Sequence, residues 1–353
     1  MNPRQANIVG AGLIGGSISL GLKKAGWRTY ISDIDPALSA QAVELGIADE
    51  TGLEAAADVT VVATPVGQVA IVVAQILSEV TGAVTDVGST KADICRAIDH
   101  PRFVGGHPMA GSEQDGLAGS RTDMFAGATW VLTPSEATDE SAVMVVRSMV
   151  TDLDADMVML PALTHDRIVA KVSHVPHLAS AALMAIADNS AVDHQVLLRL
   201  AAGGFRDMTR IAAGSPEIWP DICFSNKTAI VASLGQLIDS LSDVRESVQY
   251  GDRDSLMALL EQARGARLNI PIGFDSAGSL VEISTLISDK PGQIAIVSNM
   301  AAENNINIYD LEISHSSEGT RGVMTLLVDA TDATKFEELL NNDGYSCRVR
   351  PID

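Results

Sequence analysis

The chain has 353 residues, of which 46% are hydrophobic and 20% are charged, and its formal net charge at pH 7 is −21. This length allows two or three domains with buried cores, and the negative charge argues against nucleic acid or an anionic membrane as a partner. No apolar run approaches the ~20 residues of a membrane span, and nothing resembling a signal peptide precedes the first expected strand, so we expect a cytoplasmic protein.

The first half of the chain alternates short apolar strands with helical stretches, which predicts a parallel α/β sheet of the Rossmann type over residues 1–162. The expected strands are Ala6–Val9, Thr29–Ser32, Val59–Ala63, Ala83–Asp86, Phe103–Gly105, Thr129–Leu132 and Asp156–Leu160. The expected helices are Ile14–Ala25, Ala37–Leu45, Gln68–Val80, Lys91–Ile98 and Glu140–Leu153.

Residues 163–272 are rich in Ala and Leu at helical spacing and predict an all-α domain. The expected helices are Asp166–Ala187, kinked by Pro176, then Pro220–Gln249 and Asp252–Leu268. Ser215 and Asp252 are typical helix starts, and Pro216 lies just inside the first of them.

Turn-forming residues 269–278 predict a linker, and residues 279–353 then predict a small α+β domain in the order βαββαβ. Its expected elements are strand Leu280–Ile287, helix Gln293–Asn304, strands Ile308–His315 and Gly322–Val328, helix Thr334–Asn342 and strand Tyr345–Val349.

A glycine-rich turn follows the first expected strand. Gly10, Gly12 and Gly15 are spaced as in a dinucleotide-binding turn, with Leu13 and Ile14 opening the helix whose N-terminus would meet the pyrophosphate. Asp33, at the end of the second strand, is placed to bind a ribose hydroxyl pair and to repel a 2′-phosphate. The turn therefore predicts NAD as cofactor, in preference to NADP.

Other strand ends at the same edge carry polar residues. Thr64 and Pro65 end one strand and are expected to line the nicotinamide side. Ser89 and His107 end two further strands, and a histidine near its ordinary pKa can accept a hydroxyl proton while hydride leaves the same carbon. A structural histidine in a glycine-rich loop is the alternative that the motif alone leaves open.

The helical region carries a second set of polar residues. His174 and His177 could share one helix face, but no cysteine or carboxylate completes a metal site, and the widely spaced Cys95, Cys223 and Cys347 offer none either. Arg206 and Arg210, four apart in an expected helix, could present two cations to a carboxylate ligand. Ordinary surface arginines remain the alternative, and Trp219 could form a pocket wall or part of the core.

Five motifs in this order resemble the prephenate dehydrogenase family: VGAGLIGGSISLGLKKAG, TDVGSTK, FVGGHPMAGSEQDG, SHVPHLASAAL and GGFRDMTRIAAGSPEIW. The resemblance implies an NAD-dependent oxidative decarboxylation of prephenate to 4-hydroxyphenylpyruvate, in tyrosine biosynthesis. It assigns His107 to the ring hydroxyl, Ser89 to assisting His107, and Arg210 to a substrate carboxylate. His177, Arg206, Ser173 and Trp219 would complete the substrate pocket, and the helical domain would form a homodimer.

The C-terminal domain resembles an ACT regulatory module, of which the Asp289-Lys290-Pro291-Gly292 turn is typical. The resemblance implies feedback inhibition by tyrosine, bound near that turn and the following strand. The residues it points to are Asp289, Pro291, Gly292, Gln293, Asn307 and Ile308. A plain Pro-Gly turn explains the same motif locally.

Three rival functions are compatible with parts of the sequence. Arogenate dehydrogenase performs the same chemistry on a substrate with an amine in place of the keto group, and nothing in the sequence separates the two. A reductase of the 6-phosphogluconate dehydrogenase type would need a lysine in a glycine-rich helix, and Lys171 lacks those glycines. A non-catalytic NAD-bound amino-acid sensor is disfavoured by the joint presence of Ser89, His107 and Arg210.

Overall fold

The computed structural model describes residues 3–111, 114, 116–188, 203–268, 280–288, 290–315 and 321–351. It divides into two compact units, and we treat each by itself. The first comprises Met1–Leu197 and Met208–Asp239, and the second comprises Leu198–Asp207 and Ser240–Asp353. The domain boundaries expected from the sequence remain predictions.

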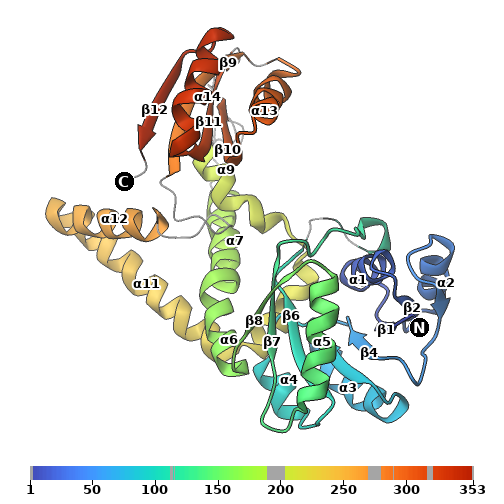
Figure 1. Cartoon of the computed structure of the whole chain (residues 1–353). Coiled ribbons are helices and arrows are strands. Elements are labelled where there is room, and N and C mark those ends of the chain that lie inside the picture. Colours follow the sequence, from blue (N-terminus) through green and yellow to red (C-terminus); the bar gives the residue numbers. More distant parts are fainter. Residues whose placement is uncertain are drawn as a thin grey trace. The chain divides into compact units, whose positions relative to one another are not determined.

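The first unit is built on an eight-stranded sheet in the order β3-β2-β1-β4-β5-β6-β7-β8, as Figure 1 shows in blue to green. All neighbouring pairs are parallel except β6 and β7, so the sheet is of the predicted Rossmann type with one antiparallel pair that the sequence analysis did not foresee. The sequence analysis also missed β3, which is only two residues long. The strands are β1 (Gln5–Val9), β2 (Arg28–Ser32), β3 (Glu50–Thr51), β4 (Val59–Val62), β5 (Ala83–Asp86), β6 (Phe103–Pro108), β7 (Thr129–Thr133) and β8 (Asp156–Met159).

Helices cover both faces of this sheet. Ile18 and Leu22 of α1 join Val146 and Met149 of α5 in one buried cluster, whereas Val69 and Val73 of α3 join Ile94 of α4 in another. These helices lie where the apolar periodicity predicted them, within two residues at each end. They are α1 (Leu13–Lys24), α2 (Pro36–Glu44), α3 (Val66–Glu79), α4 (Ala92–Ala97) and α5 (Glu140–Asp152).

A long helical run follows β8. It consists of α6 (Ala162–Val169), a π-helical segment η2 (Ala170–His174) and α7 (Val175–Asp188), so it begins four residues before the predicted start at Asp166. Pro176 lacks an N–H and would clash with the carbonyl four residues earlier, and the π segment ends two residues before it. By length and composition alone, Ala162–Asp188 could span a membrane. Within this run, His165 and Asp166 are buried and hydrogen-bonded to each other.

The rest of the helical region is more divided than predicted. Arg206 lies in α9 (Gly203–Thr209), whereas Arg210 begins the 3₁₀ helix η3 (Arg210–Ala213), so the two arginines do not share one helix. The predicted helix Pro220–Gln249 is interrupted at Asn226, which separates α10 (Trp219–Ser225) from α11 (Lys227–Tyr250). Pro216 opens η4 (Pro216–Ile218), and Asp252 caps α12 (Arg253–Leu268) by accepting the Ser255 N–H.

The C-terminal part of the second unit has the predicted βαββαβ order. Its four strands form an antiparallel sheet in the order β10-β11-β9-β12, and α13 and α14 pack with it around buried residues such as Ile283, Met324 and Phe336. The elements are β9 (Leu280–Ser288), α13 (Gln293–Glu303), β10 (Ile308–His315), β11 (Arg321–Asp329), α14 (Ala330–Asn342) and β12 (Cys347–Pro351).

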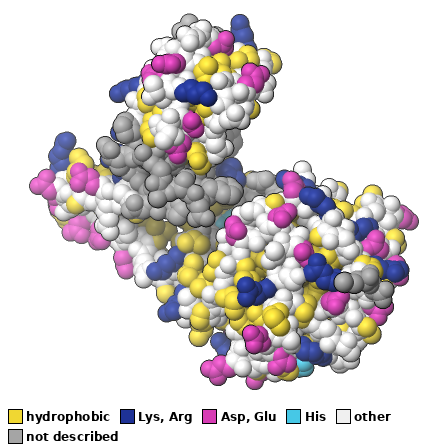
Figure 2. All heavy atoms as spheres, in the orientation of Figure 1, with side chains coloured by type: hydrophobic (Ala, Val, Ile, Leu, Met, Phe, Trp, Pro, Cys, Tyr) yellow, Lys and Arg dark blue, Asp and Glu magenta, His cyan; other side chains and the backbone are white. Residues whose placement is uncertain are grey.

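Acidic and basic side chains are interspersed with hydrophobic ones on the face of the molecule drawn in Figure 2. Among the described residues, no group of three or more His, Cys, Asp or Glu side chains is arranged to hold a metal ion.

Candidate active site

The turn between β1 and α1 has the geometry that a dinucleotide requires. Gly10 has φ +113°, and a Cβ there would lie 2.4 Å from the Ala63 carbonyl oxygen. A Cβ on Gly15 would lie 2.0 Å from the Gly10 carbonyl oxygen, so only glycine lets α1 pack this close to β1. A Cβ on Gly12, by contrast, would meet open space. Since Gly12 directly precedes Leu13 at the start of α1, the backbone here is open to a pyrophosphate at a helix N-terminus.

Asp33 follows β2 at the same edge of the sheet. Its carboxylate accepts the Ala11 N–H at 2.7 Å and the Asp35 N–H at 2.9 Å, which ties it to the glycine turn. Thr64, after β4, has a buried Oγ1 without a hydrogen-bond partner among the described residues, and Pro65 caps α3. A carboxylate fixed beside the turn and an unpartnered buried hydroxyl fit the ribose and nicotinamide ends of NAD.

The loop that carries Ser89 is fastened by a buried ion pair. Lys91 and Asp86 are both fully buried, and the Lys91 ammonium pairs with the Asp86 carboxylate. Asp86 also accepts the Gly88 N–H at 2.8 Å and the Gly106 N–H at 3.1 Å. These contacts join the end of β5 to β6, and the two strands are neighbours in the sheet.

His107 lies within β6, paired with Val131 of β7, because the strand continues to Pro108 and not only to the predicted end at Gly105. Its Nδ1 is hydrogen-bonded at 2.8 Å to Nε2 of His165, whose Nδ1 is 2.8 Å from Oδ1 of Asp166. Asp166 also accepts the backbone N–H groups of Lys91 and Ala92 at 2.8 and 2.9 Å. The recorded side-chain partner of His107 is therefore His165, and the assistance of Ser89 remains a prediction.

Asp166, His165 and His107 form a hydrogen-bonded relay, and the Asp166 carboxylate determines which ring nitrogens of the two histidines carry protons. Ionised Asp166 only accepts, so His165 carries its proton on Nδ1 and offers Nε2 as the acceptor. His107 then donates from Nδ1, which leaves its Nε2 lone pair available as a base. Burial would raise the pKa of Asp166, but the hydrogen bonds from His165 and from the Ala92 and Lys91 backbone hold that pKa below its ordinary value.

The electrostatic surroundings keep His107 neutral. Burial lowers the pKa of His107 well below 6.5, and the charges of His165, Lys91 and His174 lower it further. A neutral imidazole with a free Nε2 is the form that can accept a proton at neutral pH.

The predicted substrate residues on α7 and α10 meet in one place. The His177 and Trp219 rings are stacked with centroids 3.6 Å apart, and His174 meets the same Trp219 ring edge-on at 6.2 Å. The segment η3, which begins with Arg210, packs against α7. Ser173 lies in η2 directly before His174 and is half-buried. Arg206 belongs to the second unit, so its role in the pocket remains a prediction.

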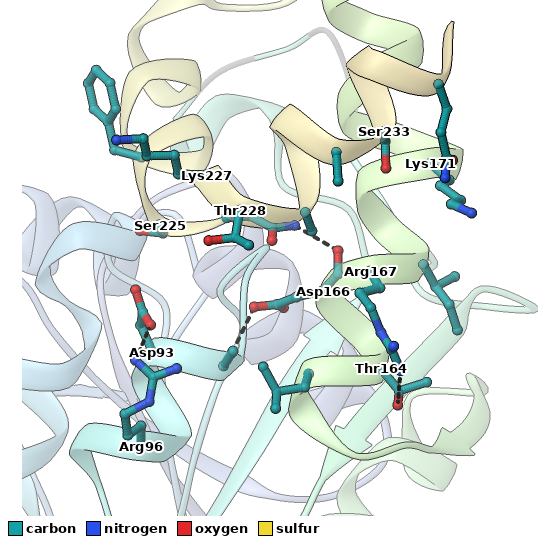
Figure 3. Close-up of a pocket in the computed structure, with 18 residues that line it drawn as sticks. Asp93, Arg96, Thr164, Asp166, Arg167, Lys171, Ser225, Lys227, Thr228 and Ser233 are labelled. Carbon is teal, nitrogen blue, oxygen red and sulfur yellow. Dashed lines mark hydrogen bonds and ion pairs between the residues drawn. The ribbon is translucent and has the colours of Figure 1, made fainter. Parts of the chain in front are cut away.

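A separate pocket of about 950 Å³ lies between α4, α6 and α11 (Figure 3). Arg96, Arg167, Lys171 and Lys227 contribute cations to its lining, but none of the predicted site residues lines it. Asp166 reaches this pocket from α6, with its carboxylate turned toward the backbone of α4 (Figure 3). The pocket therefore contacts the relay at Asp166.

Sequence reasoning missed His165, Asp166 and Asn226. The adjacent His165 and Asp166 between the apolar residues of Leu160–Val169 are a usable signal of a buried polar site, because buried polar side chains need partners. Asn226, which the structure buries between α6 and η2, has no local motif that would reveal it.

The glycine turn, the fixed acid beside it and the buried histidine base at the same edge of the sheet define an α/β dinucleotide-dependent dehydrogenase. Residues 18–159 match the family model "Prephenate dehydrogenase, nucleotide-binding domain", and residues 161–262 match "Prephenate dehydrogenase, dimerization domain". The chain belongs to the prephenate dehydrogenase family, with a Rossmann-type domain followed by a helical dimerization domain.

Individual relatives agree with this assignment. The chain is 32% identical to the prephenate dehydrogenase of Bacillus subtilis, over 94% of either chain. It is 28% identical to the crystal structure of prephenate dehydrogenase from Aquifex aeolicus in complex with hydroxyphenyl propionate and NAD+, with a TM-score of 0.71, covering 77% of this chain and 99% of that one. It is also 28% identical to Synechocystis arogenate dehydrogenase, with a TM-score of 0.66, covering 74% of this chain and 98% of that one.

Proposed function

We propose that the chain catalyses the NAD+-dependent oxidative decarboxylation of prephenate to 4-hydroxyphenylpyruvate. The observation that carries this proposal is the buried His107, whose Nδ1 is hydrogen-bonded to His165 and whose neutral ring keeps a lone pair on Nε2, at the sheet edge where the glycine turn receives the dinucleotide. Family membership supplies the substrate.

The residues act on the substrate hydroxyl. Nε2 of His107 accepts the hydroxyl proton, and His165 and Asp166 hold the ring in the tautomer that permits this. Bound NAD+ supplies the two-electron acceptor for the carbon that carries the hydroxyl group. As that carbon becomes trigonal, the bond to the ring carboxylate breaks, CO2 leaves and the ring becomes aromatic. Loss of CO2 makes the reaction effectively irreversible.

The substrate carboxylates need cations in an otherwise acidic protein. We assign the pyruvyl carboxylate to Arg210, with His177, Trp219 and Ser173 forming the adjoining wall and Arg206 contributing a second cation. The stack of His177 on Trp219 supports this wall, because it places a flat apolar surface beside η3.

Arogenate dehydrogenase is the second candidate, favoured by the equal identity to the Synechocystis arogenate dehydrogenase. Purified protein should be incubated with NAD+ and either prephenate or arogenate while NADH is followed. We expect prephenate to be the preferred substrate, and a higher kcat/KM for arogenate would reverse the assignment.

We propose that the C-terminal βαββαβ unit is an ACT domain that binds tyrosine as a feedback inhibitor. Support comes from the element order and from the turn before α13, where Gly292 has φ +94° and the Tyr345 hydroxyl lies 3.3 Å from Oε1 of Gln293. Pro291, Gly292, Gln293, Asn307 and Ile308 would line the site, whereas Asp289 lies outside the described residues.

The tyrosine proposal is tested on the full-length enzyme. Gln293→Ala should weaken inhibition by tyrosine while leaving kcat unchanged, and Gln75→Ala on α3 is the matched control. Inhibition that is unaltered in Gln293→Ala would contradict this site.

We further propose a cytoplasmic homodimer, supported by the match to a dimerization domain and by three free cysteines.

A further inference from the structure

Asn226 occupies the junction between α10 and α11 and is 4% exposed. Its Nδ2 lies 2.7 Å from the Asp166 carbonyl oxygen on α6 and 3.3 Å from Nδ1 of His174 in η2. The Asn226 side chain thus links the α10–α11 junction to α6 and to η2. It lies between Asp166, which belongs to the relay, and His174, which contacts Trp219.

The carbonyl contact fixes the orientation of the amide. A backbone carbonyl only accepts, so the group that faces the Asp166 oxygen has to be the Asn226 NH2 and not its Oδ1. The same NH2 then faces His174, and an NH2 group only donates. Nδ1 of His174 therefore has to be the acceptor, which leaves the proton of the neutral ring on Nε2.

We infer that Asn226 is a positioning residue that holds His174 as the neutral Nε2–H tautomer, so that His174 donates a hydrogen bond to an oxygen of the substrate. The inference rests on the proposed function, because the acceptor is a carboxylate or carbonyl oxygen of prephenate. His174 lies beside Trp219, whose ring also stacks on His177, so the proposed donor belongs to the cluster that is assigned to the substrate wall.

Electrostatics agree with a neutral ring. Burial lowers the pKa of His174 to about 4, with His165 lowering it and the Asp166 carboxylate opposing the shift. His107 is a third titratable group coupled to His174, since each charge disfavours the other, and Asn226 adds no charge. The donor is therefore available throughout the neutral pH range.

The variant Asn226→Asp tests the inference, because it keeps the shape of the side chain and replaces its donor by an acceptor. The new carboxylate would attract the His174 proton to Nδ1 and raise the pKa of His174. Nε2–H would then exist only in the doubly protonated ring. We expect kcat/KM for prephenate to fall by about tenfold or more as pH rises through that new pKa, while KM for NAD+ stays unchanged.

Asn7→Asp is the matched control. Asn7 is likewise buried and donates to a backbone carbonyl, Glu54, at 2.9 Å, but it lies on β1 away from these histidines. It should lower stability without adding an ionisation to the pH profile. In the double variant His174→Gln/Asn226→Asp the new ionisation should disappear, because the Gln amide supplies an N–H where Nε2 stood. A pH profile of Asn226→Asp parallel to that of the wild type would overturn the inference.

Two further measurements test the inference if Asn226→Asp does not fold. In the otherwise wild-type enzyme, His174→Gln should retain at least about tenfold more kcat/KM than His174→Asn, whose shorter amide reaches only the Nδ1 position. Equal loss in both would contradict the role. Imidazole nitrogen chemical shifts of the isotope-labelled wild type report the tautomer without any substrate, and a protonated Nδ1 on His174 would refute it. Wild-type enzyme inactive on prephenate would overturn the proposed function instead, and with it the substrate contact.

Discussion

The imidazoles of His107 and His165 meet through an Nδ1–Nε2 hydrogen bond of 2.8 Å, with their planes at 77°. This contact joins a strand of the nucleotide-binding domain to the first helix of the dimerization domain. Through this contact, the hydrogen bond between Asp166 and His165 determines which nitrogen of His107 carries the proton. The tautomer of His107 therefore depends on His165, which is 58 positions away in sequence.

Loss of the relay should lower kcat. In His165→Ala, His107 loses the partner that selects its tautomer, and kcat should fall by at least about tenfold, since a positioned base is worth ~10²–10⁴. Turnover is measured by NADH formation at saturating substrates. Asp93→Asn, an exposed carboxylate paired with Arg96 on α4, is the control and should be neutral. Unchanged kcat in His165→Ala would remove the relay from the mechanism.

Stability should fall at mildly acidic pH. His107 and His174 have folded-state pKa values below 6.5, with that of His174 at about 4, so the unfolded chain binds more protons in this interval. The free energy of unfolding should therefore decline as pH drops from 6.5 toward 4. Thermal unfolding measured at neutral and mildly acidic pH tests this, and His174→Gln should weaken the dependence. A melting temperature constant over the interval would contradict it.

Two glycines of the dinucleotide turn should respond differently to alanine. Gly12→Ala places a methyl group in open space and should fold normally while raising KM for NAD+. Gly15→Ala forces a Cβ to within 2.0 Å of the Gly10 carbonyl oxygen and should destabilise the fold itself. Thermal melts and KM for NAD+ separate the two effects. Equal stability of the two variants would show that the close approach is not limiting.

Arg210→Ala should raise KM for prephenate more than KM for NAD+, because the guanidinium is assigned to a substrate carboxylate. Steady-state kinetics with each substrate varied in turn measure the two constants. Arg264→Ala on α12 serves as the surface control. If KM for prephenate is unchanged in Arg210→Ala, the carboxylate assignment fails.

Lys91→Met should destabilise the first unit by about 3–5 kcal/mol, because it leaves the Asp86 carboxylate buried without its cation. Denaturant unfolding followed by circular dichroism gives the free energy. Lys23→Met, whose partner Asp49 is partly exposed, should cost much less. Similar losses in the two variants would mean that burial of the Lys91–Asp86 pair is not decisive.

Much of this organisation was readable from sequence. Periodicity placed the helices of the sheet domain because each buries one apolar face, and the Gly10–Gly15 spacing located the cofactor turn. The antiparallel β6–β7 pair was not predictable, because strand direction depends on a long connection and not on the strand residues. The break at Asn226 and the π segment before Pro176 also escaped, since each depends on partners distant in sequence.

The site divided in the same way. His107 lies in a motif with its own glycines and is identifiable from sequence, whereas the sequence suggests Ser89, after the neighbouring strand, as its partner. In the structure His107 contacts His165 on α6, and only the packing of that helix against the sheet reveals the contact. The sequence predicts Asp166 as a helix start, but its carboxylate accepts hydrogen bonds from His165 and from the backbone of α4.

The central claim is that neutral His107 accepts a proton from prephenate as NAD+ is reduced. The most direct measurement compares wild type and His107→Asn for NADH and CO2 released from prephenate, with His100→Asn, three residues before the start of β6, as a control. The account predicts equal amounts of NADH and CO2 from the wild type and a kcat lower by at least ~100-fold in His107→Asn. Near-wild-type turnover in His107→Asn, or no NADH from prephenate with the wild type, would contradict it.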